Sequence, residues 1–308
     1  MDAADLRVFE AVARLGGMNR AAAELNNVQS NVTARIRLLE GELRTPLFHR
    51  HSRGVTLTAA GHRLLPYAAR VRHLLDDARR AALDDGTPKG PLTIGSLETT
   101  AALRLSPLLS AYVAAYPGVD LVLRTGTTCE LVERVLEHRL EGAFVCGPVS
   151  HPDLDEETVF REELVILAAP SAGNLDDLIG RGDLRIVVLR AGCSYRQRLE
   201  AILARRGASG LRRLEFGTLE AIFGCVGAGL GLTLLPRSLI GPVWREGRVA
   251  VHELPADEAR ADTLFIRRRD AFVSSALAAF LQRARGAFVR AEAAEWTSLS
   301  EKQIASII

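Results

Sequence analysis

Hydrophobic and polar residues alternate with helical spacing in three short runs at the start of the chain. The first run covers residues 5–15, and the glycine pair at residues 16–17 is expected to end that helix. Asn19 is a suitable N-cap for a second, short helix, because its side chain can accept a bond from a helix-start N–H group. The asparagine pair at residues 26–27 predicts the turn that follows.

The third run predicts a helix from about Ser30 to Leu43 with two different faces. Its buried stripe comprises Val32, Ile36, Leu39 and Leu43. The opposite face is small and polar in the middle and basic at its sides, which suits entry into the major groove of DNA. The side chains expected to contact DNA are Gln29, Ser30, Asn31, Thr33, Ala34, Arg35 and Arg37. Two helices joined by a tight turn, the second of them polar, indicate a helix-turn-helix.

A small hairpin is expected directly after this helix. The short apolar segments 47–48 and 55–57 flank a polar turn, a pattern typical of two paired strands. Arg50 and Arg53 lie near its tip and are candidates for contacts with phosphates or a minor groove. Ordinary surface charge is the alternative interpretation of both arginines.

Residues 1–58 resemble the winged helix-turn-helix of LysR-type transcriptional regulators. The motifs that carry the resemblance are the alanine pair before the turn, Gln29-Ser30, Leu39-Glu40, Pro46-Leu47-Phe48 and Arg53-Gly54-Val55. The resemblance implies binding of double-stranded promoter DNA as a homodimer or homotetramer. It also implies a response to a small-molecule effector, with RNA polymerase as a further candidate partner.

Heptad spacing continues through residues 59–86, which predict one long helix capped by Thr58. Pro66 lies inside this helix and should remove one backbone hydrogen bond. The seam expected to join two subunits comprises Leu64, Tyr67, Val71, Leu74 and Ala78. Packing of the helix on its own domain is the alternative. In the family that the chain resembles, this linker helix pairs two subunits.

Strand-like and helix-like segments alternate after a turn-rich hinge at residues 84–91. Two successive β-α-β series predict an α/β domain with parallel sheets over residues 87–290. The fold class expected is therefore a two-lobed α/β effector domain, similar to a periplasmic-binding-protein fold, behind an α-rich winged helix-turn-helix and a long linker helix. Residues 291–308 form a C-terminal tail that is either a docked helix or mobile.

Hydroxyl side chains stand where several strands of this domain end and helices begin. The candidates for effector binding are Ser96, Thr99, Thr100, Thr127, Thr128 and Ser194. Hydroxyls and free N–H groups at helix starts suit a carboxylate or a similar small organic anion, although for any one residue plain N-capping is the simpler interpretation. Glu98 departs from this pattern, because its carboxylate would oppose an anion.

Charge is unevenly distributed although the net charge is only +2. Residues 1–86 hold 13 Arg and 10 acidic residues, which gives the first part of the chain a positive balance. Arginine replaces lysine almost everywhere, so the arginines alone would indicate no more than a solvated surface. A membrane-spanning run and a secretory signal are both absent from the sequence, so we expect a cytoplasmic protein without membrane contact.

Catalytic, cofactor-binding and metal-binding motifs are not evident. Ser194 lacks the G-x-S-x-G context of a hydrolase, and the glycines at residues 227–231 fit a helix end better than a dinucleotide loop. The four cysteines form no CxxC pair. We therefore expect a regulator that is not an enzyme and needs no cofactor or metal. Two alternatives remain: a redox-sensing regulator that uses a cysteine thiol, and an α/β enzyme fused to a DNA-binding module.

Overall fold

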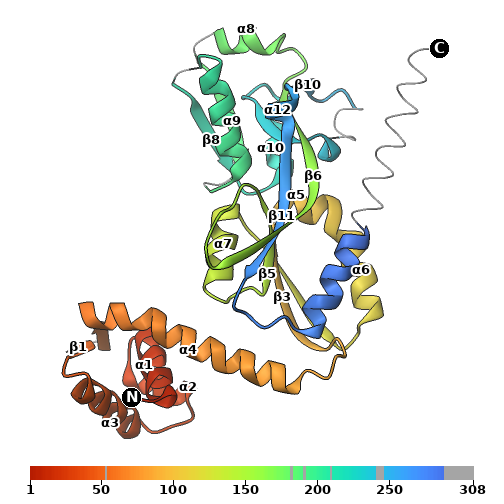
Figure 1. The fold of residues 1–308 in the computed structure, drawn as a ribbon. Helices are drawn as coiled ribbons and strands as arrows, with labels where there is room; N and C mark the ends of the chain where they lie inside the picture. Colours follow the sequence, from red (N-terminus) through yellow and green to blue (C-terminus); the bar gives the residue numbers. More distant parts are fainter. Residues whose placement is uncertain (53, 181–182, 190–191, 209, 241–245, 288–308) are drawn as a thin grey trace. The chain divides into compact units, whose positions relative to one another are not determined.

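The computed structural model describes residues 1–52, 54–180, 183–189, 192–208, 210–240 and 246–287 (Figure 1). It divides into two compact units, an N-terminal unit of Met1–Asp84 and a C-terminal unit that begins at Asp85. The predicted tail, residues 291–308, lies outside the described residues, as does Arg53. In the described part, no helix has the length and apolar character needed to cross a membrane.

Three helices form the core of the N-terminal unit. They are α1 (Ala3–Leu15), α2 (Met18–Glu24) and α3 (Gln29–Glu42). The C-cap of α1 is Gly16, whose φ of 65° is the left-handed conformation that glycine adopts without strain. The prediction for the second helix was wrong in detail, because Gly17 is its N-cap and Asn19 already lies inside it. Asn26 makes the expected turn, with φ 49°.

The predicted hairpin and long helix follow. Strands β1 (Phe48–His51) and β2 (Gly54–Leu57) pair antiparallel, and α4 runs from Ala59 to Leu83. Thr58 caps α4 as predicted, since its Oγ1 accepts a bond from the Gly61 N–H at 3.0 Å. Gly61 packs so closely that a Cβ there would lie 2.4 Å from the Leu47 carbonyl oxygen. This close approach joins the start of α4 to the winged helix-turn-helix.

The first lobe of the C-terminal unit is built on three parallel strands. β3 (Gly90–Ser96) pairs with both β4 (Val119–Thr125) and β5 (Gly142–Cys146). The helices of this lobe are α5 (Glu98–Thr100), the π-helical η1 (Ala101–Leu105), α6 (Ser106–Ala115), α7 (Thr128–Leu136) and a helix at residues 275–287. α6 and residues 275–287 lie on one side of the strands and α7 on the other (Figure 1).

The second lobe has its own parallel pair, β7 (Arg185–Leu189) with β8 (Arg212–Phe216). Its other elements are α8 (Leu175–Gly180), α9 (Ser194–Arg205), α10 (Leu219–Gly227), β9 (Thr233–Pro236), η2 (Arg237–Leu239), β10 (Ala250–His252) and α12 (Ala256–Ala259). α10 ends at Gly227, and Gly229 follows with φ 77° before the chain enters β9. The glycines of this segment therefore end a helix, as predicted.

Two long strands connect the lobes. β6 (Leu154–Ala168) and β11 (Arg260–Arg268) pair antiparallel, and the ends of β6 reach into both lobes (Figure 1). In the second lobe, β9 and β10 also pair antiparallel with β6. The prediction of parallel sheets was therefore incomplete, because the main sheet is mixed. Thr263 pairs with Phe160 and Leu264 with Thr158, a register shift that marks a bulge where β11 runs along β6.

Candidate DNA-binding surface and effector cavity

The outer face of α3 is exposed and polar, as predicted. Val32, Ile36 and Leu39 are buried, while the exposed residues include Gln29, Ser30, Asn31, Ala34 and Arg37. Leu43 was wrongly assigned to the buried stripe. α3 ends at Glu42, so Leu43 is its C-cap and is 36% exposed. Leu38, which sequence reasoning missed, is 71% exposed and widens this face with an apolar side chain.

Two residues of the expected face turn out to lie at its edge. Thr33 is half-buried, and its Oγ1 is buried without a partner among the described residues. The Arg35 guanidinium donates to an Asp5 carboxylate oxygen at 3.0 Å. Asp5 in turn belongs to the capping box of α1, so Arg35 joins the two helices. Helical spacing alone could not reveal either arrangement, because both depend on where α1 packs.

Glu40 positions the hairpin relative to α3. One of its carboxylate oxygens accepts bonds from the Leu47 N–H at 2.8 Å and the Phe48 N–H at 3.2 Å. The other oxygen lies 3.4 Å from the Arg50 guanidinium. Arg50 is thereby held beside the end of α3. The only signal for Glu40 in the sequence was its place in the motif Leu39-Glu40.

The predicted seam of α4 is exposed only in part. Tyr67 and Leu74 are 64% and 65% exposed, and Ala78 is exposed between charged residues. Leu64 and Val71 instead pack partly against the core of their own unit. The predicted seam therefore divides into a part that closes the N-terminal unit and a part that is free in this single chain.

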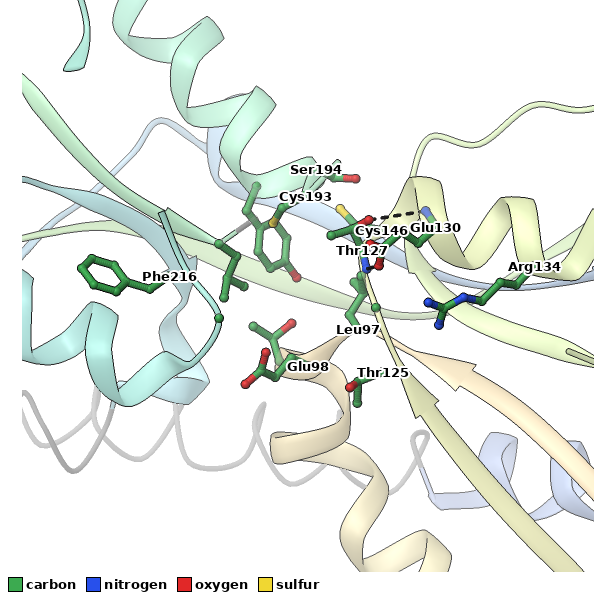
Figure 2. Close-up of a pocket in the computed structure, with 15 residues that line it drawn as sticks. Leu97, Glu98, Thr125, Thr127, Glu130, Arg134, Cys146, Cys193, Ser194 and Phe216 are labelled. Atoms are coloured by element: carbon green, nitrogen blue, oxygen red, sulfur yellow. Dashed lines mark hydrogen bonds between the residues drawn. The ribbon is translucent and has the colours of Figure 1, made fainter. Parts of the chain in front are cut away.

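A cavity of about 190 Å³ lies between the two lobes of the C-terminal unit (Figure 2). Of the six predicted effector residues, Thr99, Thr127 and Ser194 line it. Its further lining residues are Leu97, Glu98, Thr125, Gly126, Glu130, Arg134, Cys146, Leu189, Cys193, Tyr195, Phe216 and Gly217. The first lobe contributes the residues up to Cys146 and the second lobe those from Leu189 onward.

The other three predicted residues do not line the cavity, because their hydroxyls are used within the protein or buried. The Ser96 hydroxyl donates to the Leu97 carbonyl, and Thr100 is 2% exposed. Thr128 Oγ1 accepts bonds from the Cys146 N–H at 3.4 Å and from the Ser194 hydroxyl at 2.9 Å. The bond between Thr128 and Ser194 crosses from α7 of the first lobe to the start of α9 in the second.

Further hydroxyls line the cavity nearby. Thr99 belongs to the first lobe and Tyr195 to the second, and burial raises the pKa of the tyrosine well above its usual value. On the first lobe, Thr127 caps α7, and the Glu130 carboxylate accepts the Thr127 N–H at 3.1 Å in a capping box. Hydroxyls and helix starts therefore do meet at this cleft, but partly by bonding to one another.

The charged side chains of the cavity were not foreseen apart from Glu98. Arg134 is the one cationic residue among the described residues that line it. Its guanidinium extends from α7 toward the cavity, while Glu98 lies on the opposite side (Figure 2). The sequence carried no signal for Arg134, because its place on α7 makes it look like an ordinary surface residue.

Two thiols face the same cavity, Cys146 from the first lobe and Cys193 from the second. Burial raises the pKa of Cys146 to about 11 and also raises the pKa of Cys193. Both groups are therefore held as neutral thiols, the form that reacts poorly with oxidants. Within the described residues, no group of three or more His, Cys, Asp or Glu side chains could hold a metal ion.

Both the N-terminal unit and the C-terminal unit match known protein families. Residues 3–62 match the family model of the bacterial regulatory helix-turn-helix proteins of the lysR family, and residues 85–289 match the LysR substrate binding domain. The transcriptional regulator GltR of Bacillus subtilis is 45% identical over 92% of this chain and 96% of its own length.

Two solved structures extend the likeness to three dimensions. Full-length CbnR in complex with its target DNA is 25% identical, with a TM-score of 0.60 over 93% of this chain and 100% of CbnR. ArgP from Mycobacterium tuberculosis shares the fold at 21% identity, with a TM-score of 0.68 over 93% of this chain and 97% of ArgP. The chain belongs to the LysR family and is a DNA-binding transcriptional regulator with an effector-binding domain.

Proposed function

We propose that the exposed face of α3 reads promoter DNA and that the cavity between the lobes binds the small molecule that controls this activity. In this proposal, residues 1–58 bind DNA, residues 59–86 join two subunits, and residues 87–290 bind the effector. The observation that carries it is a cavity lined by both α/β lobes, beside which the Ser194 hydroxyl of the second lobe donates to Thr128 of the first at 2.9 Å. A ligand that enters there changes contacts between two lobes at once.

The base-reading residues in this proposal are those that α3 leaves exposed. Ser30, Asn31 and Arg37 offer donors and acceptors for base edges, and Ala34 allows close approach to the groove. Arg50 and Arg53 add contacts to the DNA backbone, with Arg50 placed by Glu40. The complex of CbnR with its target DNA shows that a chain of this fold binds DNA.

A binding role for the cavity is favoured over catalysis. The Ser194 hydroxyl donates to Thr128, so it is not prepared as a nucleophile by a neighbouring base. The two thiols carry raised pKa values, which weakens the redox alternative as well. The relatives are transcriptional regulators, and we infer the same non-catalytic action for this chain, in the cytoplasm where promoter DNA lies.

The test of the effector site uses Ser194→Ala in the full chain. Carboxylates and amino acids are first screened for an increase in the melting temperature of the wild-type protein. Because a hydrogen bond to a charged group contributes about 1.5–3 kcal/mol, Ser194→Ala should weaken binding of a hit roughly tenfold or more. Ser110→Ala, an exposed serine on α6, is the matched control and should leave binding unchanged.

DNA affinity is measured in parallel with the DNA upstream of the chain's own gene. Without effector, Ser194→Ala should bind this DNA as wild type does, because α3 belongs to the other unit. With effector, the variant should require a correspondingly higher concentration to change DNA binding. A hit that stabilises Ser194→Ala and wild type equally would place the effector site elsewhere.

A further inference from the structure

A large apolar side chain lies on the outer face of α3, among the residues proposed to read DNA. Leu38 is 71% exposed, the highest value among the large apolar residues in the described part of the chain. It does not belong to the core of the N-terminal unit, to which α3 contributes Val32, Ile36 and Leu39. The packing of this unit therefore does not account for a leucine at this position.

The surface around Leu38 is low enough for a partner to reach it. At about 100° per residue, Ala34 falls between Arg37 and Leu38 around the axis of α3. Ala34 is exposed, and a Cβ added at Gly41, one turn further along, would meet no atom within 4 Å. Arg37 and Leu38 therefore protrude side by side from the same turn, with small residues before and after them.

The charge of this face favours a polyanion as the partner. Both acidic residues of α3 bind groups within their own unit. Glu40 accepts the Leu47 and Phe48 N–H groups, and Glu42 accepts the Met1 amino group. The outer face thus offers a basic side chain and an apolar one, which suits the major groove of DNA better than an ordinary protein surface.

Within the major groove, the chemistry of leucine selects one base. A leucine side chain neither donates nor accepts hydrogen bonds, so it gains nothing from phosphates or from the polar groups of base edges. The apolar group that a base edge presents in this groove is the C5-methyl of thymine. Contact with that methyl removes apolar surface of both groups from water, which is favourable.

We propose that Leu38 is a specificity-determining residue of this regulator and that it packs against the C5-methyl of a thymine in each half-site. This inference rests on the proposed function of α3 as the helix that reads promoter DNA. It goes further by naming a base that the site must contain, beneath the same turn of α3 from which Arg37 extends.

The test removes the methyl group from one thymine at a time. The binding site is first located by footprinting the DNA upstream of the chain's own gene, and a synthetic duplex of that site is prepared. Each thymine is then replaced by deoxyuridine, which keeps the pairing with adenine but lacks the methyl. Fluorescence anisotropy should show one position in each half-site where the replacement weakens binding of the full-length protein about fourfold, as expected for one buried methyl.

Protein variants then assign that effect to its residue. Leu38→Ala should bind the thymine and uracil duplexes with equal affinity at this position, whereas Leu38→Met keeps an apolar side chain and should still distinguish them. Leu230→Ala is the matched control, since Leu230 is an exposed leucine of the C-terminal unit. It should lose as much affinity on the uracil duplex as wild type does. The melting temperatures of the Leu38 variants should match wild type, because the side chain is exposed.

The possible results separate this inference from the proposed function of α3. If no uracil replacement weakens wild-type binding, or if one weakens wild type and Leu38→Ala equally, the role of Leu38 is wrong. A selective loss of specific binding in Arg37→Ala would then show that α3 still reads DNA. If Leu38→Ala and Arg37→Ala both bind the site as wild type does, the proposed function of α3 is itself wrong. Unchanged DNA binding by Leu38→Ala with reduced transcription by purified RNA polymerase would make Leu38 a polymerase contact and overturn the inference.

Discussion

At the scale of single residues, packing separates the two arginines of α3 that sequence analysis treated alike. Arg35 is tied to Asp5 of α1, whereas Arg37 is exposed and has no ion pair among the described residues. An arginine that already holds two helices together contributes to stability more than to recognition. An unpaired arginine on the outer face can reach a guanine edge.

We therefore expect Arg37→Ala to weaken binding to the specific promoter fragment by about 1–3 kcal/mol, the value typical of one bidentate base contact. Binding to random duplex DNA should change much less. Fluorescence anisotropy with both duplexes at fixed salt measures the two affinities. Arg35→Ala is the matched variant and should lower the melting temperature of the N-terminal unit instead. An equal loss on both duplexes would make Arg37 a phosphate contact.

Residue-scale chemistry also predicts an order of reactivity for the cysteines. Cys146, with a pKa of about 11, is ionised in roughly one molecule in a thousand at pH 8. Cys129 is exposed, so iodoacetamide should modify it first in the native protein, and Cys146 and Cys193 should react only after unfolding. Mass spectrometry of labelled peptides gives the order. Rapid native labelling of Cys146 would revive the redox alternative.

The raised pKa of Cys146 also makes the folding stability of the protein depend on pH. The folded protein keeps the Cys146 proton to a higher pH than the unfolded chain, whose thiol ionises near pH 8.5. The contribution of this group to stability is therefore complete below about pH 8.5 and is lost as the pH rises toward about 11.

At the scale of elements, α4 has two roles along its length. Leu64 and Val71 pack partly on the core of the N-terminal unit, so changing them would damage folding and assembly together. Tyr67 and Leu74 remain exposed in the single chain. Burying exposed apolar side chains of a long helix against a second copy is the usual reason for their presence.

Leu74→Asp should therefore convert dimers into monomers in sedimentation velocity at micromolar concentration, because a carboxylate at the seam has no partner across it. The melting temperature of the C-terminal unit should not change. Arg79→Asp places the same residue on the same helix away from the seam and should remain dimeric. Persistence of the dimer in Leu74→Asp would show that another surface holds the subunits together.

At the scale of the whole molecule, each unit has its own hydrophobic core. The N-terminal core contains Phe9, Val12 and Ile36, whereas Phe144 and Ile166 belong to cores of the C-terminal unit. Separate cores allow separate cooperative unfolding. We therefore expect two transitions when the full chain is heated in a calorimeter.

Variants and ligand should move these transitions independently. Glu40→Ala leaves the Leu47 and Phe48 N–H groups without their carboxylate acceptor and should lower the first unit's transition alone. An effector should raise only the transition of the C-terminal unit. A single transition that shifts as one under both treatments would show that the units unfold together.

The sequence alone determined the features that depend on neighbours along the chain. The helix-turn-helix, the hairpin and the caps at Thr58 and Thr127 were all predictable. Each depends on hydrogen bonds and periodicity within a few residues, so local residue type is sufficient. The family resemblance extended this to the two-lobed fold and to DNA binding, which the matches to both family models confirm.

Only the tertiary structure decided which hydroxyls face the cavity and which charges accompany them. The antiparallel pairing of β6 with β11 and the contact of Ser194 with Thr128 join residues far apart in sequence. Such pairings follow from the packing of whole lobes, which no local pattern encodes. Arg134 is another residue whose role in the cavity could not be predicted from local sequence. Its position on α7 was predictable, but its place at the cavity depends on where the second lobe lies.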